Sequence, residues 1–241
     1  MERAEYLEAL AEAAAGLLAA AGRADPDAGV PCCPEWTAAD LVWHIGEVHD
    51  FWAHVVRDGE RPPAGRNVRP DTYADLIDFA AGTSAELQRA LAAADPADPA
   101  WNWSGRDQTV GWVLRRMTHE TAVHRVDAAR VDGGDHRLVP ALAVDGIDEF
   151  LTYFVPDDES GAPALAGSVH LHCTDADGEW TVTPGDDGVT VARDHAKADT
   201  ALRGAANDLL LVLWRRLPLD AVTVFGDAAL AAAFAHGGVT D

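Results

Sequence analysis

Apolar side chains recur at intervals of three and four residues along the first half of the chain, which is the spacing of one face of an α-helix. The pattern predicts four helices, over residues 2–22, about 37–56, about 72–94 and about 110–131. Thr37 with Asp40 three positions later predicts a capping box at the start of the second helix. Four amphipathic helices in succession indicate a four-helix bundle.

The pattern changes near residues 131–135, where Val-Asp-Gly-Gly-Asp marks a boundary. Beyond it, short alternating runs separated by Asp/Gly turns are typical of antiparallel strands. These runs cover residues 168–173, 179–183, 189–192, 200–203 and 222–225, and helices are expected over 141–154, 205–216 and 228–235. The sequence therefore predicts a two-domain α+β protein. Residues 1–134 form the bundle, and residues 135–241 form a small α+β domain with an antiparallel sheet.

Composition narrows the classes of function. The length of 241 residues and a hydrophobic content of 48% fit two packed domains. No run of about 18 apolar residues is present, and the charged N-terminus lacks a secretory signal, so we expect a cytoplasmic protein without a membrane partner. A net charge of −22 argues against nucleic acid as a partner. We expect a monomer or homodimer acting on small molecules.

The fourth predicted helix carries polar groups on its inward stripe. By helical spacing, that stripe consists of Val113, Met117, Glu120, His124, Asp127 and Val131. It begins and ends apolar, so it should face the core. Buried carboxylates and imidazoles are stabilised by pairing or by a metal ion. A metal site is one interpretation of the stripe, and a salt-bridged Glu-His pair on a solvated face is the other.

A second helix offers a third ligand. His44 lies beside the apolar stripe of the helix over residues 37–56, so it should also point inward. Glu120 and His124 are four residues apart and can reach one ion together. Two histidines and one carboxylate suit Zn²⁺, with Ni²⁺, Fe²⁺ or Mn²⁺ possible, and leave positions open for water or substrate. Asp127 either orients a metal ligand or bound water, or pairs with an arginine on the helix surface.

The remaining histidines and the cysteines are weaker candidates. His49 and His54 lie off the inward stripe, and His119 points away from Glu120. His170 and His172 are two residues apart in a predicted strand and so lie on the same face, where they either pair with each other or are ordinary sheet residues. Three cysteines are too few for a disulfide scaffold. For Cys32 and Cys33, a redox pair is an alternative to a packing role.

Several motifs resemble one family. Residues 33–44, Cys-Pro-Glu-Trp-Thr-Ala-Ala-Asp-Leu-Val-Trp-His, resemble an opening motif of the mycothiol-dependent maleylpyruvate isomerase family. Residues 119–128, His-Glu-Thr-Ala-Val-His-Arg-Val-Asp-Ala, resemble its metal-binding helix, and residues 207–216 and 224–227 are similar to its second domain. The resemblance implies a DinB-like bundle that binds a divalent metal, usually zinc, through His44, Glu120 and His124. It also implies a sterol-carrier-like C-terminal domain.

The resemblance further implies that an arginine of the second domain helps to form the active site. The family's Trp-Gly-Arg pattern aligns with Trp214, Arg215 and Arg216, so Arg216 is the candidate, although Arg215 stands where the family has glycine. The implied activity is that of a mycothiol-dependent isomerase or S-transferase. In it, the metal lowers the pKa of the thiol cosubstrate and Arg216 holds a substrate carboxylate. Two other hypotheses are a 2-His-1-carboxylate iron oxygenase and a non-enzymatic ligand-binding module with a structural metal.

Overall fold

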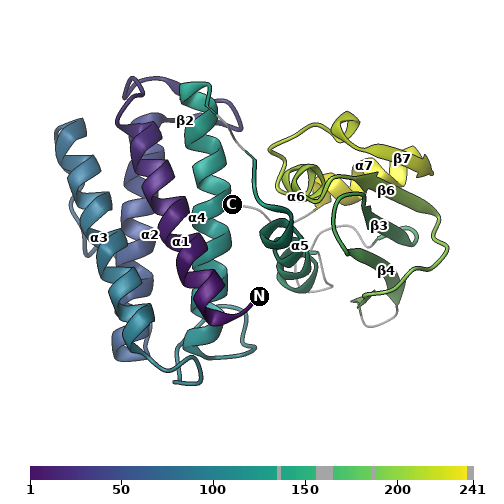
Figure 1. Cartoon of the computed structure of the whole chain (residues 1–241), viewed down its shortest axis with the longest axis horizontal. Helices are drawn as coiled ribbons and strands as arrows, with labels where there is room; N and C mark the ends of the chain where they lie inside the picture. The colour runs from purple at the N-terminus through teal and green to yellow at the C-terminus, as the bar shows by residue number, and fades with distance from the viewer. Residues whose placement is uncertain (135–136, 156–164, 186–187, 238–241) are drawn as a thin grey trace. The chain divides into compact units, whose positions relative to one another are not determined.

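The computed structural model describes residues 1–134, 137–155, 165–185 and 188–237. The chain divides into two compact units, Met1–Arg137 and Leu138–Asp241 (Figure 1). The sequence placed the boundary after Gly134, next to residues 135–136, which lie outside the described residues. The first unit is mainly helical and the second combines helices with a larger sheet, so the predicted α+β class is confirmed.

Four helices build the first unit, as the sequence predicts. They are α1 (Arg3–Ala21), α2 (Ala38–Asp58), α3 (Tyr73–Ala93) and α4 (Val110–Asp132). Helix α4 packs against α1 and α2, and α3 packs against the same two helices (Figure 1). The predicted capping box begins α2. The Thr37 hydroxyl accepts from the Asp40 backbone N–H at 3.2 Å, and the Asp40 carboxylate accepts from the Thr37 N–H at 2.9 Å.

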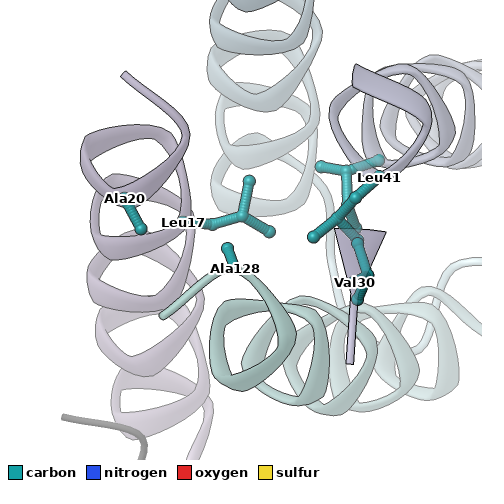
Figure 2. Packing of buried hydrophobic residues seen from close by; sticks show 6 residues of the cluster. Leu17, Ala20, Val30, Leu41 and Ala128 are labelled. Carbon is teal, nitrogen blue, oxygen red and sulfur yellow. The ribbon is translucent and has the colours of Figure 1, made fainter. Parts of the chain in front are cut away.

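A short hairpin precedes α2, in a part of the chain where the sequence predicts no strand. Strand β1 (Gly29–Val30) pairs antiparallel with β2 (Cys33–Thr37). The prediction missed β1 because two residues are too few for alternation to be recognised, and it missed β2 because that strand contains Pro34 and its burial does not alternate. The hairpin contributes Val30 to the core of the bundle, where Figure 2 shows it among side chains of α1, α2 and α4. The labelled members are Leu17, Ala20, Val30, Leu41 and Ala128.

Close packing of α2 against α3 depends on one glycine. A Cβ atom at Gly46 would lie 2.6 Å from Cε1 of Phe79, closer than packed carbon atoms approach. This contact fixes one face of α2 against α3. Other residues of the same helix, His44 among them, face α4.

The second unit holds a five-stranded sheet in the order β5-β4-β3-β6-β7. The strands are β3 (Val169–Cys173), β4 (Glu179–Gly185), β5 (Gly188–Ala192), β6 (Thr200–Gly204) and β7 (Thr223–Gly226). The helical segments are α5 (Pro140–Tyr153), α6 (Ala206–Leu213), the 3₁₀ turn Leu219–Ala221 and α7 (Ala228–Gly237). All the predicted strands and helices are therefore present. Among the described residues, no helix is sufficiently long and apolar to span a membrane.

The sheet is mixed, which corrects the prediction of an antiparallel one. Strand β6 pairs parallel to β3, whereas the other pairs are antiparallel. Ala192 at the end of β5 is level with Thr181 and His170, and Thr200 at the start of β6 is level with Val169. Residues 193–199 therefore cross over β4 and β3 at one end of the sheet, and they do not run back along the length of the strands before β6 begins. The chain enters β6 at the same end as β3, which makes the two strands parallel.

Candidate metal centre

Two helices of the first unit bring the predicted ligands together. His44 of α2 and His124 of α4 both direct Nε2 at Oε1 of Glu120, at 3.3 Å and 3.2 Å. The centroids of the two imidazole rings are 4.9 Å apart, and the ring planes meet at 69°. One ligand atom from each of the three residues lies within 4.8 Å of the others. The predicted inward stripe of α4 is thus buried or partly buried along its length.

An arginine orients the carboxylate. Arg116 lies one turn before Glu120 on α4, is itself buried, and donates from Nη2 to Oε2 at 2.5 Å. That bond occupies one carboxylate oxygen and leaves Oε1 facing the imidazoles. Burial raises the pKa of Glu120, but the charges of His124 and Arg116 outweigh it and hold the pKa well below its ordinary value. Glu120 is therefore an anion at neutral pH.

An aspartate orients the second imidazole. Oδ2 of the fully buried Asp127 lies 3.0 Å from Nδ1 of His124. A carboxylate only accepts hydrogen bonds, so Nδ1 carries the proton and Nε2 faces Glu120. Burial lowers the pKa of His124, but Glu120 and Asp127 more than offset this and raise it to about 9. The two carboxylates thus favour a positive charge at the position between His124 and Glu120.

Trp36 forms an apolar wall beside the two imidazoles. Its ring centroid lies 4.7 Å from that of His44 and 6.0 Å from that of His124. The residue belongs to β2, so the unpredicted hairpin positions it. The indole therefore presents an apolar surface to both imidazoles.

A cavity of about 300 Å³ opens beside His44. One side is α2 and the other is the segment 63–67. The Asp50 carboxylate there accepts a hydrogen bond from Asn67 at 3.0 Å and lies 3.6 Å from the Arg66 guanidinium. The cavity therefore combines charged groups with the apolar surface of Val48 and Phe51.

His49 is a buried residue that the sequence analysis placed off the inward stripe, and this prediction was wrong. Helix α2 packs against both α3 and α4, so more than one stripe of it is covered. The Thr121 hydroxyl donates to the Met117 carbonyl at 2.6 Å, so it accepts from His49 Nε2–H at 2.9 Å. Burial lowers the pKa of His49 to about 4, which keeps the ring neutral. The spacing does distinguish it from His54: His49 lies four residues after Ile45 and three before Trp52, both buried, whereas His54 lies four residues from Asp50 and from Asp58.

The donor set fits a divalent cation. Two imidazoles and a carboxylate are typical ligands of zinc and related metals. Asp127 and Arg116 hold His124 and Glu120 in fixed orientations, as the neighbours of metal ligands commonly do. These features support the predicted ligands, whose role as a metal site stays a prediction.

Arg215 and Arg216 lie in the second unit, just after α6. Arg215 has a left-handed backbone, with φ of 58°. The backbone N–H of Arg215 donates to the Val212 carbonyl at 3.0 Å, and the backbone N–H of Arg216 donates to the Leu211 carbonyl at 2.7 Å. This is the Schellman ending of a helix, which usually has glycine at the left-handed position. The helix therefore ends at Leu213, earlier than the predicted residue 216. Arg216 Nη1 donates to the carbonyl of Trp214 at 2.9 Å.

The cysteines have local contacts. Sγ of Cys32 accepts from Arg130 Nη1 at 2.8 Å, and Cys33 packs against the core cluster of the bundle. Burial raises the pKa of Cys173 to about 12, so this thiol stays protonated at neutral pH.

Two family models match the chain. One, described as the mycothiol maleylpyruvate isomerase N-terminal domain, matches residues 7–129, and the corresponding C-terminal domain matches residues 141–233. The chain belongs to the mycothiol maleylpyruvate isomerase family. This confirms the resemblance that the motifs around His44 and Glu120 indicated.

Solved structures of the family share the fold. A crystal structure of mycothiol-dependent maleylpyruvate isomerase has a TM-score of 0.66 at 15% identity and covers 93% of each chain. A histidine-to-alanine mutant of mycothiol-dependent maleylpyruvate isomerase has a TM-score of 0.68 at 14% identity, with the same coverage. At this identity the likeness shows the fold alone. Among curated proteins, none matches the sequence significantly.

Proposed function

We propose that the chain is a metal-dependent thiol enzyme that isomerises a maleylpyruvate-type cis-enedione acid with mycothiol as cosubstrate. The observation that carries this proposal is the convergence of His44, Glu120 and His124 on one point, with Asp127 and Arg116 orienting two of them. Family membership supports the thiol and the class of substrate. Zn²⁺ suits the donor set best, and Ni²⁺, Fe²⁺ and Mn²⁺ are compatible with it.

A divalent cation held by these ligands would lower the pKa of a thiol, so that the thiolate forms near neutral pH. The remaining chemistry is addition and elimination. The thiolate adds to one carbon of the cis double bond, the resulting single bond rotates, and elimination of the thiolate leaves the trans isomer. The thiol is regenerated by the elimination, and the reaction involves no net oxidation or reduction. Retention of the adduct would instead give an S-transferase.

The chain's own residues would position the reactants. His124 presents Nε2 because Asp127 holds its Nδ1–H, and Trp36 presents an apolar surface on one side. The cavity beside His44 offers Asp50, Asn67 and Arg66 as hydrogen-bonding groups for the polar body of the thiol. Arg216 is proposed to hold a substrate carboxylate, for which a guanidinium is geometrically suited.

The proposal is tested by the isomerisation rate of maleylpyruvate with and without mycothiol. Wild-type protein loaded with zinc should turn over only with the thiol, and both chelation and His44→Ala should reduce the rate by at least about 100-fold. His54→Ala is the matched control, because His54 lies on the same helix and pairs with Asp58 at 3.1 Å instead of facing the site. Undiminished turnover in metal-stripped protein and in His44→Ala would overturn the proposal. Accumulation of a thiol adduct would identify the transferase.

A further inference from the structure

A second group of metal-ligating side chains lies on one face of the sheet in the second unit. His170 and His172 alternate along β3, so they project from the same face. Glu179 of β4 lies opposite His172 in the strand register. Residues 193–199 cross this face on the way from β5 to β6 and bring His195 to it. One ligand atom from each of the four residues lies within 4.8 Å of the others.

The three imidazoles converge on a single carboxylate oxygen. Nδ1 of His172 contacts Oε1 of Glu179, and Nδ1 of His195 lies 3.1 Å from the same atom. His170 Nε2 lies 4.0 Å from it. The rings of His170 and His195 are perpendicular, with centroids 5.1 Å apart. A hydrogen bond connects only two of these nitrogen and oxygen atoms at a time, whereas a metal cation at their centre can bind all four.

His170 supplies an independent observation that points to a ligand. The residue is only 7% exposed, and its Nε2 has no hydrogen-bond partner among the described residues. Buried polar atoms are nearly always satisfied, so an unpartnered nitrogen directed at three other metal-ligating groups calls for an explanation. A bound metal ion provides the missing partner.

We propose that His170, His172, Glu179 and His195 form a second divalent-metal site, which fastens the crossing segment 193–199 to the sheet. Three imidazole nitrogens and one carboxylate oxygen complete a tetrahedral sphere for Zn²⁺. Four protein ligands leave no position for substrate, so the site is structural. Ni²⁺ and Cu²⁺ also bind imidazole and are alternative occupants.

The crossing segment is already positioned for this role. The Asp194 carbonyl accepts from the Thr181 hydroxyl at 3.4 Å, and the Arg193 guanidinium pairs with Asp148 at 3.0 Å. His195 itself is exposed, which gives an ion a route to the buried His170. The proposal does not rest on the proposed thiol chemistry, because none of these four ligands is one of the three proposed ligands in the first unit.

Metal titration of the full-length, metal-free chain tests the proposal. Zn²⁺ binding is measured by calorimetry, and Co²⁺ binding by the visible absorption that reports tetrahedral coordination. The His44→Ala protein should still bind one ion, and adding His195→Ala should weaken that binding by at least about 100-fold, since even neighbours of ligands contribute 10–100-fold. Because His195 is exposed, its replacement should leave the fold intact, which circular dichroism checks.

His236→Ala is the matched control, since His236 is an exposed histidine of the same unit. It should leave binding to the His44→Ala protein unchanged. Zinc should also slow amide hydrogen exchange over residues 193–199 in His44→Ala protein but not in the His44→Ala/His195→Ala protein. The proposal is wrong if His44→Ala protein binds no ion, or if adding His195→Ala changes neither the affinity nor the exchange.

Discussion

Each proposed ligand on α4 has a neighbour about one turn away that fixes its orientation. Asp127 lies three residues after His124 and binds its Nδ1, and Arg116 lies four residues before Glu120 and binds its Oε2. Residues at these spacings are adjacent on a helix surface. A single segment of sequence therefore encodes two ligands together with the groups that direct them. Only His44 comes from another element.

Replacing Asp127 with asparagine should weaken metal binding without unfolding the protein. Asparagine keeps the volume of the buried side chain and an oxygen that accepts from His124 Nδ1, but it removes the charge that raises the basicity of the imidazole. In a His195→Ala background, where the second proposed site is disrupted, we expect the dissociation constant for zinc to rise about 10–100-fold. Asp132→Asn, near the end of the same helix, where the residue pairs with Arg23, should leave it unchanged. Equal affinities in the two variants would show that Asp127 does not support the site.

His49 should make the stability of the protein depend on pH. Its pKa is about 4 in the folded state and 6.5 in the unfolded chain, so the unfolded state binds the proton more tightly. The free energy of unfolding should therefore fall as the pH drops from 6.5 to 4, by about 3 kcal/mol from this residue. Above pH 7, His49 is unprotonated in both states, so its contribution to the free energy of unfolding no longer changes with pH. Urea denaturation of wild type and His49→Gln measures it, because glutamine retains a donor for Thr121 but does not titrate. Parallel stability curves would contradict the assignment.

Single residues were predictable from the sequence where one helical register determined their surroundings. Glu120, His124 and Asp127 lie on a stripe whose ends are apolar, and the structure buries or partly buries all three. His49 was misplaced although it shares helical spacing with Ile45 and Trp52, because a polar side chain within an apolar stripe was assigned to its edge. His195 could not be connected with His170 because a crossing segment brings them together, and that path depends on the strand pairing.

At the scale of elements, the end of α6 shows a conflict between sequence and backbone. Arg215 occupies the left-handed position of a Schellman motif with φ of 58°, where a side chain is strained and glycine is not. The arginine also donates to the His236 carbonyl at 2.6 Å. This contact partly offsets the strain.

Comparing two variants at this position isolates the backbone contribution. Arg215→Gly and Arg215→Ala both lose the contact with His236, but only alanine retains the strained Cβ. The glycine variant should therefore be more stable than the alanine variant by about 1 kcal/mol in chemical denaturation. Arg216→Ala and Arg216→Gly provide the reference for a neighbouring residue without the left-handed conformation. If alanine were the more stable at Arg215, the Schellman ending would not exist in solution.

Elements were more predictable than their pairing. The capping residues Thr37 and Asp40 identified the start of α2 because the side chains that begin a helix are local to it. Strands β3 to β7 were recognisable from alternation between turns, which is also local. The parallel pairing of β3 with β6 was not, because it depends on where residues 193–199 cross the sheet. In the hairpin before α2, β1 was too short to recognise, and β2 lacks alternation and contains Pro34.

At the scale of the whole molecule, each unit carries its own candidate metal centre. Ligands that bind only the folded state stabilise it in proportion to the logarithm of their concentration. In a His195→Ala background, where the second site is removed, zinc at about 100 times its dissociation constant should stabilise the first unit by about 3 kcal/mol. Calorimetric unfolding with and without chelator measures this, and a further His44→Ala change should abolish it. A zinc effect that survives both substitutions would place the ion elsewhere.

The coordination of thiol by the bound ion is the most direct test of the proposed chemistry. In the His195→Ala protein, Co²⁺ is expected to occupy only the proposed centre formed by His44, Glu120 and His124, so that its spectrum would report that site alone. Adding mycothiol should produce an intense sulfur-to-metal charge-transfer band, saturating at one thiol per ion, and His44→Ala should abolish the band. A spectrum unchanged by saturating thiol, or a band that persists in His44→Ala, would contradict a thiolate activated at this site.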